Sequence, residues 1–285
     1  MDKIPITVII PTRNEENNID GVLKSVVGWA SQVIVVDSQS TDSTLDIVGN
    51  YEVELLQFHY VGGWLKKRQW VMDTYPIRNE WILLLDADEI PGDKVKSEIE
   101  RAIHSDRYDG YWIPFKLEFL GKPLSFGNSV IYKLFLFRKG KGRYERILTD
   151  QIKEMSDIEV HEHIVVEGQV GKLKHPVYHR NHNSLFRYIL KHNEYSTWEA
   201  HALVKGTNDD IKPDLFGNRI QRNRWLKRFV MMMPFSSHLL FIYLYLFRLS
   251  FLDGYRGYVF CKLKSIQWSH IKFKVYEMRN VERHH

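Results

Sequence analysis

Cysteine is almost absent from this sequence, because Cys261 is the only one among 285 residues. A single cysteine excludes an internal disulfide and any cysteine-rich zinc site, which favours a reducing compartment. Uninterrupted apolar stretches of about 18 residues, the length that suggests a transmembrane helix, are missing as well. The start of the sequence, MDKIPITVII, runs directly into a strand-like segment, so we expect no signal peptide.

Acidic residues are scarce only at the C-terminal end. Residues 219–285 hold 13 Lys or Arg and three Asp or Glu, a net charge of +10, whereas residues 1–218 carry −5. A basic end of this kind suggests contact with phospholipid headgroups or nucleic acid, although an ordinary solvated face has the same composition. The whole chain, with 44% apolar and 26% charged residues, has the composition of a folded enzyme or binding domain.

A short apolar run lies inside this basic end. Residues 229–247 contain no charged side chain, but a proline, two serines and a histidine interrupt them and leave 235–247 as the cleaner part. Runs of this length are more often buried or interfacial than spanning. Flanking cations and abundant aromatic rings favour an interfacial membrane anchor, while a helix packed on the protein and a true span remain open.

The first half of the chain alternates between two apolar periodicities. Continuous runs rich in valine and isoleucine, typical of buried parallel strands, occupy residues 5–11, 32–37 and 81–86. Apolar residues recur with helical spacing over 19–27, and a second helix begins within 41–48. This order predicts an α/β fold with a doubly wound sheet that binds its ligand beyond the carboxyl ends of the strands.

The second half has a different pattern. Aromatic, alternating stretches over 108–177 indicate a smaller, partly antiparallel subdomain. Helical spacing returns over 184–205, and the basic end closes with a last aromatic helix after Asp253 and Gly254.

The segment LLLDADE places Asp86 and Asp88 at the end of a buried strand. Two carboxylates at this spacing can present hard oxygen ligands to Mg²⁺ or Mn²⁺, whose remaining positions take diphosphate oxygens and water. An acidic turn before a helix would look the same in isolation. The position at a strand end of an open α/β sheet favours the metal and diphosphate interpretation.

Two polar loops precede this segment. IIPTRNEEN follows the first strand and VVDSQSTDST follows the second, so that Asp37 can accept an N–H of a nucleotide base and Arg13 can bind ribose or phosphate oxygens. Ordinary helix capping explains much of each loop alone. The two loops in this order, followed by DAD, form a highly specific pattern.

Six segments together resemble the successive motifs of family 2 glycosyltransferases: PTRNEENNI, VDSQSTDST, GGWLKKRQWVMD, WILLLDADE, VHEHIVVEG and SFLDGYRGY. The similarity is strongest to small bacterial enzymes of lipopolysaccharide-core and exopolysaccharide synthesis, and it covers nearly the whole chain. It implies a GT-A fold, which is a Rossmann-like, mostly parallel sheet flanked by helices. It also implies a nucleoside-diphosphate sugar donor, Mn²⁺ or Mg²⁺, and inversion at the anomeric carbon.

The resemblance also assigns site residues. It places in the nucleotide-sugar site Pro11, Arg13, Glu15, Asp37, Asp42, Lys67, Arg68, Asp86 and Asp88. It makes Asp86 and Asp88 metal ligands, with His161 as a candidate third ligand. Glu162 takes the place of the base that accepts the proton of the acceptor hydroxyl, with Glu89 and Asp150 as alternatives. Without that resemblance, HEH would be an ordinary exposed strand.

A second group of histidines, His175, His179 and His182, follows in HPVYHRNHNS. Their spacing matches no closed tetrahedral zinc site. We expect a hydrogen-bonding loop near the active site, in which at most one of the three contacts phosphate or metal.

These observations predict a GT-A catalytic domain over 1–212, with 1–107 binding the nucleotide sugar and 108–212 the acceptor. Residues 213–285 form a basic, apolar, helical segment that associates with an anionic membrane surface. The predicted enzyme adds one sugar to a lipid-linked or lipopolysaccharide-core type glycan in surface polysaccharide synthesis. We expect it at the cytoplasmic face of the inner membrane, peripheral or monotopic, with no obligate protein partner.

Two other classes of protein fit parts of the sequence. A nucleotidyltransferase shares the sheet and the paired acids, but it would need a glycine-rich, basic phosphate loop, and TRNEEN has no glycine. A nucleic-acid-binding protein fits a pI near 9.0. Against it, the positive charge is confined to one end beside an apolar run, whereas a nucleic-acid footprint is a basic stripe.

Overall fold

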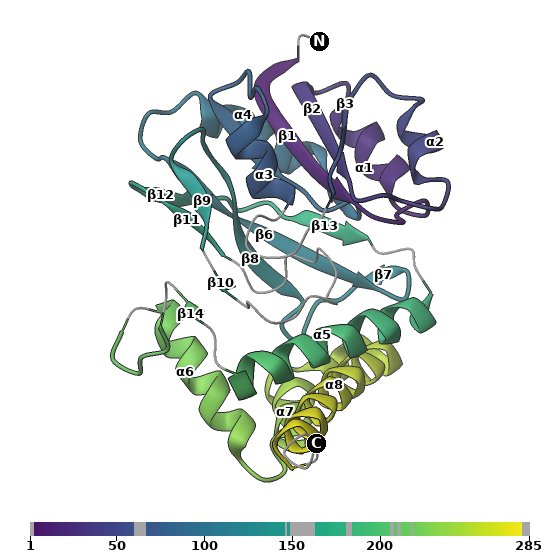
Figure 1. The fold of residues 1–285 in the computed structure, drawn as a ribbon, viewed down its shortest axis with the longest axis vertical. Coiled ribbons are helices and arrows are strands. Elements are labelled where there is room, and N and C mark those ends of the chain that lie inside the picture. The colour runs from purple at the N-terminus through teal and green to yellow at the C-terminus, as the bar shows by residue number, and fades with distance from the viewer. Residues whose placement is uncertain are drawn as a thin grey trace. The chain divides into compact units, whose positions relative to one another are not determined.

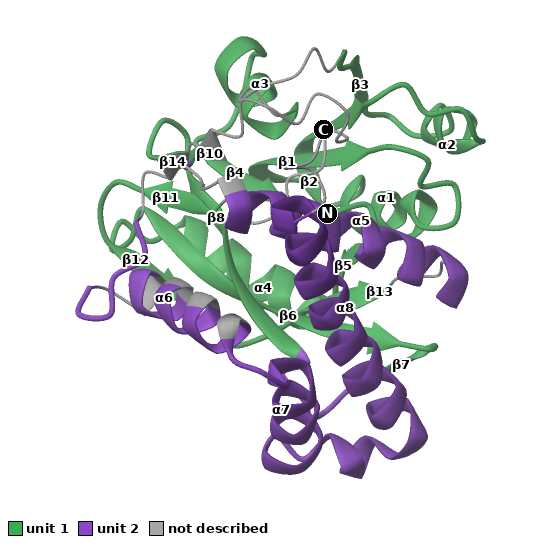
Figure 2. Cartoon of the chain, turned by 60° about the horizontal axis from the view of Figure 1, so that its bottom comes forward, with its two compact units in different colours: residues 1–123, 130–144, 156–182 green, residues 124–129, 145–155, 183–285 purple. Residues whose placement is uncertain are grey.

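The computed structural model describes most of the chain: residues 3–59, 67–145, 147–148, 163–180, 184–205, 208–209, 212–217 and 219–280. The chain forms two compact units, coloured separately in Figure 2. Unit 1 comprises residues 1–123, 130–144 and 156–182, and unit 2 comprises residues 124–129, 145–155 and 183–285.

Unit 1 is built on one mixed sheet (Figure 1), whose strands run in the order β3-β2-β1-β4-β8-β6-β13-β5. The first four are parallel to one another: β1 (Ile4–Thr12), β2 (Ala30–Asp37), β3 (Glu54–Gln57) and β4 (Trp81–Leu84). The others are β5 (Glu89–Pro91), β6 (Gly110–Phe119), β8 (Val130–Arg138) and β13 (Val177–Arg180), with β7 (Lys122–Pro123) and β12 (Val170–Lys172) paired to β6. A separate short pair joins β9 (Gly142–Tyr144) to β11 (Ile164–Val166). The α/β, GT-A type sheet expected from the sequence is confirmed.

Helices cover both faces of this sheet, which is why its central strands are apolar throughout. On one face, α1 (Ile19–Val26) and α4 (Asp93–Ile103) share a core with alternate residues of β1 and β4. On the other face, α3 (Lys67–Thr74) packs against the remaining strand residues. The short helix α2 (Thr44–Val48) follows β2.

The antiparallel strands expected over 108–177 do not form a separate subdomain. Instead, β8 pairs antiparallel with β4, with Trp81 opposite Arg138, and β6 then pairs with β8. The reason is that β1 pairs with only one edge of β4, and the backbone N–H and C=O groups of the other edge need hydrogen-bond partners in this buried position. Strand β8 supplies these partners. The aromatic strands therefore extend the sheet formed by β1 to β4.

Unit 2 is helical within its described residues. It contains α5 (Leu185–Lys205), α6 (Arg219–Met232), α7 (Ser236–Ile242) and α8 (Gly254–Asn280), with a short strand pair between β10 (Ile147–Leu148) and β14 (Asn208–Asp209). A π-helical turn, Tyr243–Phe247, and a 3₁₀ turn, Ser250–Asp253, connect α7 to α8. Both α5 and α7 pack along α8. The unit thus includes α5, which we assigned to the catalytic domain from the sequence, and the functional boundary at residue 212 stays a prediction.

A loop from the middle of the chain, residues 124–129, belongs to this helical unit. The carboxylate of Asp253 accepts the backbone N–H groups of Ser125, at 3.0 Å, and Phe126, at 2.9 Å. The N–H of Gly127 donates to the carbonyl of Arg248 at 3.0 Å. Gly127 has φ +70°, and a Cβ there would lie 2.0 Å from the Ser250 hydroxyl, so only glycine fits.

No single helix among the described residues has the length and apolarity of a membrane span. The helix pair Gln221–Met231 and Ser236–Phe247 meets those criteria only when taken together, and it is bent by 118°. A true span was one of the alternatives that the sequence left open, and no continuous helix of that length covers the apolar run in the described residues.

Candidate active site

The carboxyl ends of β1, β2 and β4 meet at one edge of the sheet. Thr12 at the end of β1 lies in register with Asp37 at the end of β2, and the N–H of Leu85 after β4 donates to Ile9 of β1. Because β2 and β4 flank β1 on opposite sides, this edge is a topological switch point, where open α/β sheets bind their ligands.

The loops after β1 and β2 are tied to each other by side chains. Asp37 is fully buried and accepts hydrogen bonds from the hydroxyl of Thr12, at 3.0 Å, and from the backbone N–H of Ser40, at 2.9 Å. Asp42 accepts from the N–H of Glu16 at 3.2 Å, and burial is outweighed by such donors, so its pKa is lowered. Asp37 and Asp42 were both predicted to contact the nucleotide. In this structure their hydrogen bonds hold the two loops in their conformation.

The remaining predicted nucleotide residues lie at the same edge. The ammonium of Lys67 is buried and donates to the carbonyl of Thr12 at 3.0 Å and to the hydroxyl of Ser38 at 3.1 Å. Glu15 accepts from the side-chain amide of Asn18 at 2.7 Å, Pro11 is half-buried in β1, and Arg13 is exposed. The structure thus brings these residues together, with Arg13 facing solvent beside the ordered loops.

Asp86 lies between two cations. One carboxylate oxygen pairs with the guanidinium of Arg68 and the other with the ammonium of Lys133, which is 2.9 Å away. Burial would raise the pKa of Asp86, but the charges of Lys133 and Arg68 hold it well below its usual range. With both oxygens engaged, Asp86 is an anionic partner of these cations here, and its predicted role as a metal ligand stays a prediction.

Glu89 forms the buried end of the same network. Its side chain has no exposed surface, accepts the backbone N–H of Asp86 at 2.7 Å and pairs with Lys133. Burial, together with the nearby charge of Asp86, raises the pKa of Glu89 to about 7. A carboxyl held so deeply beside a lysine orients its neighbours, which argues against its alternative assignment as the base that meets an acceptor.

Asp88 is joined to β13 by two contacts. Its Oδ2 lies 2.9 Å from Nε2 of His179, and its backbone carbonyl accepts the N–H of Arg180 at 2.7 Å. Although burial opposes it, the negative charge of Asp88 raises the pKa of His179. One strand and one loop from distant parts of the chain therefore present a carboxylate oxygen and an imidazole nitrogen side by side.

This pair fits a divalent cation. Two ligands at right angles, each about 2.1 Å from one octahedral ion, are about 3 Å apart, close to the separation of the Asp88 and His179 atoms. Carboxylate oxygen is a ligand that suits Mn²⁺ and Mg²⁺, and neutral imidazole is a common metal ligand in proteins. Within the ranges that the structure describes, no cluster of three or more His, Cys, Asp or Glu side chains surrounds one point. Further ligands would therefore be water, diphosphate oxygens or other residues.

Several predicted residues fall outside the described part of the chain. These are His161, the candidate third metal ligand, Glu162, the candidate base, Asp150, an alternative base, and His182. Of the other two histidines, His179 reaches the site, whereas His175 pairs with Glu98 of α4 at 2.9 Å. The expectation that at most one of the three histidines contacts phosphate or metal stays a prediction.

Sequence reasoning missed Lys133. It lies in the middle of β8, in the apolar segment VIYKLFLFR, and reaches both Asp86 and Glu89. A lysine in the middle of an apolar strand was the available signal, since a largely buried lysine requires a carboxylate partner.

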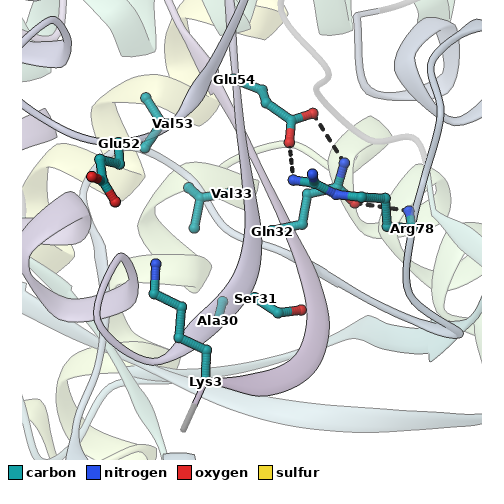
Figure 3. Close-up of a pocket in the computed structure, with 9 residues that line it drawn as sticks. All are labelled: Lys3, Ala30, Ser31, Gln32, Val33, Glu52, Val53, Glu54 and Arg78. Carbon is teal, nitrogen blue, oxygen red and sulfur yellow. Dashed lines mark hydrogen bonds and ion pairs between the residues drawn. The ribbon is translucent and has the colours of Figure 1, made fainter. Parts of the chain in front are cut away.

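A cavity of about 280 Å³ lies elsewhere, at the amino ends of the strands (Figure 3). Gln32, which lines it, uses its amide fully: the carbonyl accepts from Thr7 at 2.7 Å, and the NH₂ group donates to Glu54 at 3.0 Å. Figure 3 shows Arg78 turned toward the same glutamate. Because ligands of such sheets bind at the carboxyl ends, this cavity is separate from the candidate active site.

Comparison with known proteins identifies the family of this chain. The family model described as "Glycosyl transferase family 2" matches residues 7–160. The lipopolysaccharide core biosynthesis glycosyltransferase LpsC of Rhizobium meliloti is 30% identical over 212 residues, covering 71% of this chain and 73% of the relative. An uncharacterized glycosyltransferase of Rickettsia typhi is 26% identical over 204 residues, covering 70% of this chain and 68% of the relative.

The similarity of this chain to solved structures is weaker, both in sequence identity and in TM-score. TarS of S. aureus, residues 1–349 in complex with UDP-GlcNAc, aligns with a TM-score of 0.44 and 15% identity, covering 97% of this chain and 92% of that one. Glucosyl-3-phosphoglycerate synthase of Mycobacterium tuberculosis, in complex with Mn²⁺ and UDP, covers 41% of this chain and 44% of that one, with a TM-score of 0.31 and 19% identity. The assignment rests on the sequence matches, and by them this chain is a member of glycosyltransferase family 2.

Proposed function

We propose that this enzyme transfers one sugar from a nucleoside-diphosphate sugar to a hydroxyl of a lipopolysaccharide-core or lipid-linked glycan, with inversion at the anomeric carbon. The proposed donor is supported by the side chains at one edge of the sheet. The pair of Asp88 and His179 lies there beside an ion-pair cluster, which consists of Asp86, Arg68 and Lys133. The acceptor class is supported by the 30% identity to LpsC, whose name assigns it to lipopolysaccharide core biosynthesis.

The charges at this edge suit a diphosphate leaving group. Arg68 and Lys133 are cations held in place by the carboxylates of Asp86 and Glu89, so they are ordered before a ligand arrives and lose little freedom when they meet phosphate oxygens. Asp88 and His179 would hold Mn²⁺ or Mg²⁺. Such an ion would offset the charge that develops on the departing diphosphate.

The transfer itself requires a base on the opposite side of the sugar. The acceptor oxygen forms a bond to the anomeric carbon while the bond from that carbon to the diphosphate breaks, and the hydroxyl proton passes to a carboxylate. We assign this role to Glu162, on the resemblance of VHEHIVVEG to the family motif.

We further place the enzyme at the cytoplasmic face of the inner membrane, where lipid-linked acceptors would be within reach. The +10 charge of residues 219–285 supports attraction to an anionic surface. Neither a nucleic-acid ligand nor an obligate protein partner is part of this proposal.

Thermal shift tests the donor class directly. UDP-, GDP-, dTDP- and ADP-sugars would be screened with Mn²⁺, with Mg²⁺ and without metal, because a ligand at about 100 times its dissociation constant adds about 2.7 kcal/mol to the free energy of unfolding. We expect one nucleotide class to raise the Tm only when the metal is present. If no nucleotide sugar shifts the Tm with either metal, the proposed donor is wrong.

A further inference from the structure

Unit 2 exposes an unusual amount of large apolar surface around the connection between α7 and α8. Phe247 is 74% exposed and Tyr255 is 78% exposed, although both follow strongly apolar segments. The other large apolar side chains exposed here are Leu239, Ile242, Tyr243, Leu246, Leu249, Phe251, Leu252 and Tyr258. We call these ten residues the tip surface. Figure 2 shows α7 beside α8 in this unit.

The exposed apolar side chains continue along one face of α8. Tyr255, Tyr258, Ile266, Phe273 and Tyr276 are exposed and recur at multiples of the helical repeat. The buried residues of this helix lie between them in sequence: Gly257, Phe260, Cys261, Ser265 and Ile271. From Tyr255 to Tyr276 the stripe runs about 32 Å along the helix axis. One face of α8 therefore packs within unit 2 and the other carries an aromatic stripe.

Cations accompany this surface and acids are nearly missing from it. Residues 236–280 contain seven Lys or Arg and two Asp or Glu. One of the two acids, Asp253, already accepts the backbone N–H groups of Ser125 and Phe126. The other, Glu277, lies near the far end of α8. Among the cations, Arg248 lies within the tip segment and Lys262 lies on the aromatic face of α8, and both are exposed.

From these observations we infer that the tip surface and the aromatic stripe of α8 dock into the interfacial layer of an anionic lipid membrane. The inference rests on the membrane association proposed above and names the side chains that produce it. Leucine and phenylalanine side chains would enter the acyl boundary, tyrosine rings would lie at headgroup depth, and Arg248 and Lys262 would meet lipid phosphates. The helix lies along the membrane, and no segment needs to cross it.

A second copy of the chain is a poorer occupant of this surface. A two-fold dimer would place the same patch against itself, so the exposed cations Arg248 and Lys262 would face their own copies, with few acids nearby to pair them. An anionic membrane provides the opposite charge along the whole stripe. Charge complementarity therefore favours an anionic lipid membrane over a second copy of the chain.

Vesicle flotation tests the inference with matched variants. The tip variant combines Phe247→Ser with Leu252→Ser, and the control combines Leu55→Ser with Leu120→Ser, two exposed leucines of unit 1. All four side chains are exposed, so each substitution should leave the fold intact. With phosphatidylcholine vesicles containing phosphatidylglycerol, we expect the tip variant to partition at least about tenfold more weakly than the control and the wild type.

Salt separates the apolar from the electrostatic contribution. Wild-type binding should fall as the salt concentration rises but should keep a salt-resistant part, because apolar burial is not screened. The tip variant should lose that salt-resistant part, whereas Arg248→Gln with Lys262→Gln should lose mainly the salt-sensitive part. Equal flotation of the tip and control variants at all salt concentrations would overturn the inference.

A probe at a single site reports insertion directly. The variant Leu252→Cys would carry an environment-sensitive fluorophore, since the native Cys261 is fully buried. We expect its emission to shift to the blue with anionic vesicles, and no shift from a probe at Leu55→Cys. A wild-type dimer that the tip variant converts to monomer, with no fluorescence shift on adding vesicles, would assign the surface to a second copy instead.

Failure of this inference is distinguishable from failure of the proposed enzyme activity. Donor binding and donor hydrolysis can be measured without vesicles, and the tip variant should match the wild type in both. A protein that binds vesicles but no nucleotide sugar would refute the proposed activity and leave the docking surface standing.

Discussion

His179 Nε2 and Asp88 Oδ2 lie 2.9 Å apart, although 91 residues separate them in the sequence. The contact connects β13 to the loop after β4, at the edge where β1 and β2 also end. It shows that the acidic motif is completed by a histidine from the second half of the sheet. The motif alone is therefore an incomplete description of the site.

Replacing Asp88 with alanine should abolish transfer while leaving the fold nearly intact. The substitution removes the carboxylate proposed to bind metal, and it opens no large apolar cavity. Donor hydrolysis and Tm would be measured on the same preparation. Activity close to that of the wild type at saturating Mn²⁺ would contradict the assignment. His179→Gln should weaken the metal dependence more than it weakens donor binding in the absence of metal.

Replacing Lys133 with methionine should destabilise the protein by about 3–5 kcal/mol, because it leaves the buried carboxylate of Glu89 without its cation. The measurement is urea unfolding at neutral pH. Lys122→Met, at an exposed position of β7, is the control and should change the free energy of unfolding by less than about 0.5 kcal/mol.

A double-mutant cycle then isolates the pair. Adding Glu89→Gln to Lys133→Met removes the buried charge left behind, so the double variant should be more stable than the sum of the single effects predicts. Additive effects would mean that Lys133 and Glu89 are not coupled in the folded protein.

Replacing Glu162 with glutamine should lower the rate of transfer by about 10²–10⁴-fold and leave donor affinity unchanged, as expected for the loss of a general base. Isothermal titration with the donor and steady-state kinetics separate the two quantities. Weaker donor binding at an unchanged rate would make this residue part of the pocket wall, and Asp150→Asn would be tested next.

His192 of α5 should make stability depend on pH. It stacks on Tyr188 with ring centroids 3.9 Å apart, and its Nδ1 donates to the carbonyl of Tyr188 at 3.0 Å. Its Nε2 faces the ammonium of Lys264 at 3.4 Å. Burial first, and then the charge of Lys264, lower the pKa of His192 to about 3.

The direction of this pH dependence follows from the number of protons that the folded and unfolded chains bind. Between about pH 6.5 and about pH 3 the unfolded chain binds a proton at this ring and the folded chain does not, so the stability from the neutral ring is present above pH 6.5 and is lost as pH falls. Unfolding measured across this window should show a smaller pH dependence for His192→Gln than for the wild type. His104→Gln, exposed at the end of α4, serves as the control. Parallel curves for His192→Gln and the wild type would show that the ring is not neutral in the fold.

The sequence predicted the parallel part of the fold well, because strands covered on both faces are continuous apolar runs. It was wrong about the aromatic stretches, since an alternating strand that joins an existing sheet has the same pattern as one in a separate subdomain. For the site, order along the chain was enough to predict Asp37, Asp86 and Asp88 and to place His179 in a loop near the active site. The contacts that Lys133 and His179 make could not be predicted, because they depend on pairing between β4 and β8 and between β5 and β13.

Replacing Asp253 with alanine should destabilise unit 2 by about 1–3 kcal/mol, because two backbone N–H groups of the loop 124–129 lose their acceptor. Asp253→Asn keeps one oxygen and should cost less. Glu277→Ala, an exposed acid of α8, is the control for loss of charge. An unfolding curve for Asp253→Ala that coincides with that of Glu277→Ala would show that the loop does not need this carboxylate.

The dependence of this loop on Asp253 also sets an order of events during synthesis. Residues 125 and 126 leave the ribosome more than a hundred residues before Asp253, a delay of roughly 6 to 25 s at 5–20 residues per second. During that time the acceptors at Arg248 and Asp253 do not yet exist, so the turn that leads into β8 has no partner for these N–H groups. The strand that carries Lys133 is therefore secured at its start only after the last helix begins to emerge, late in the synthesis of the chain.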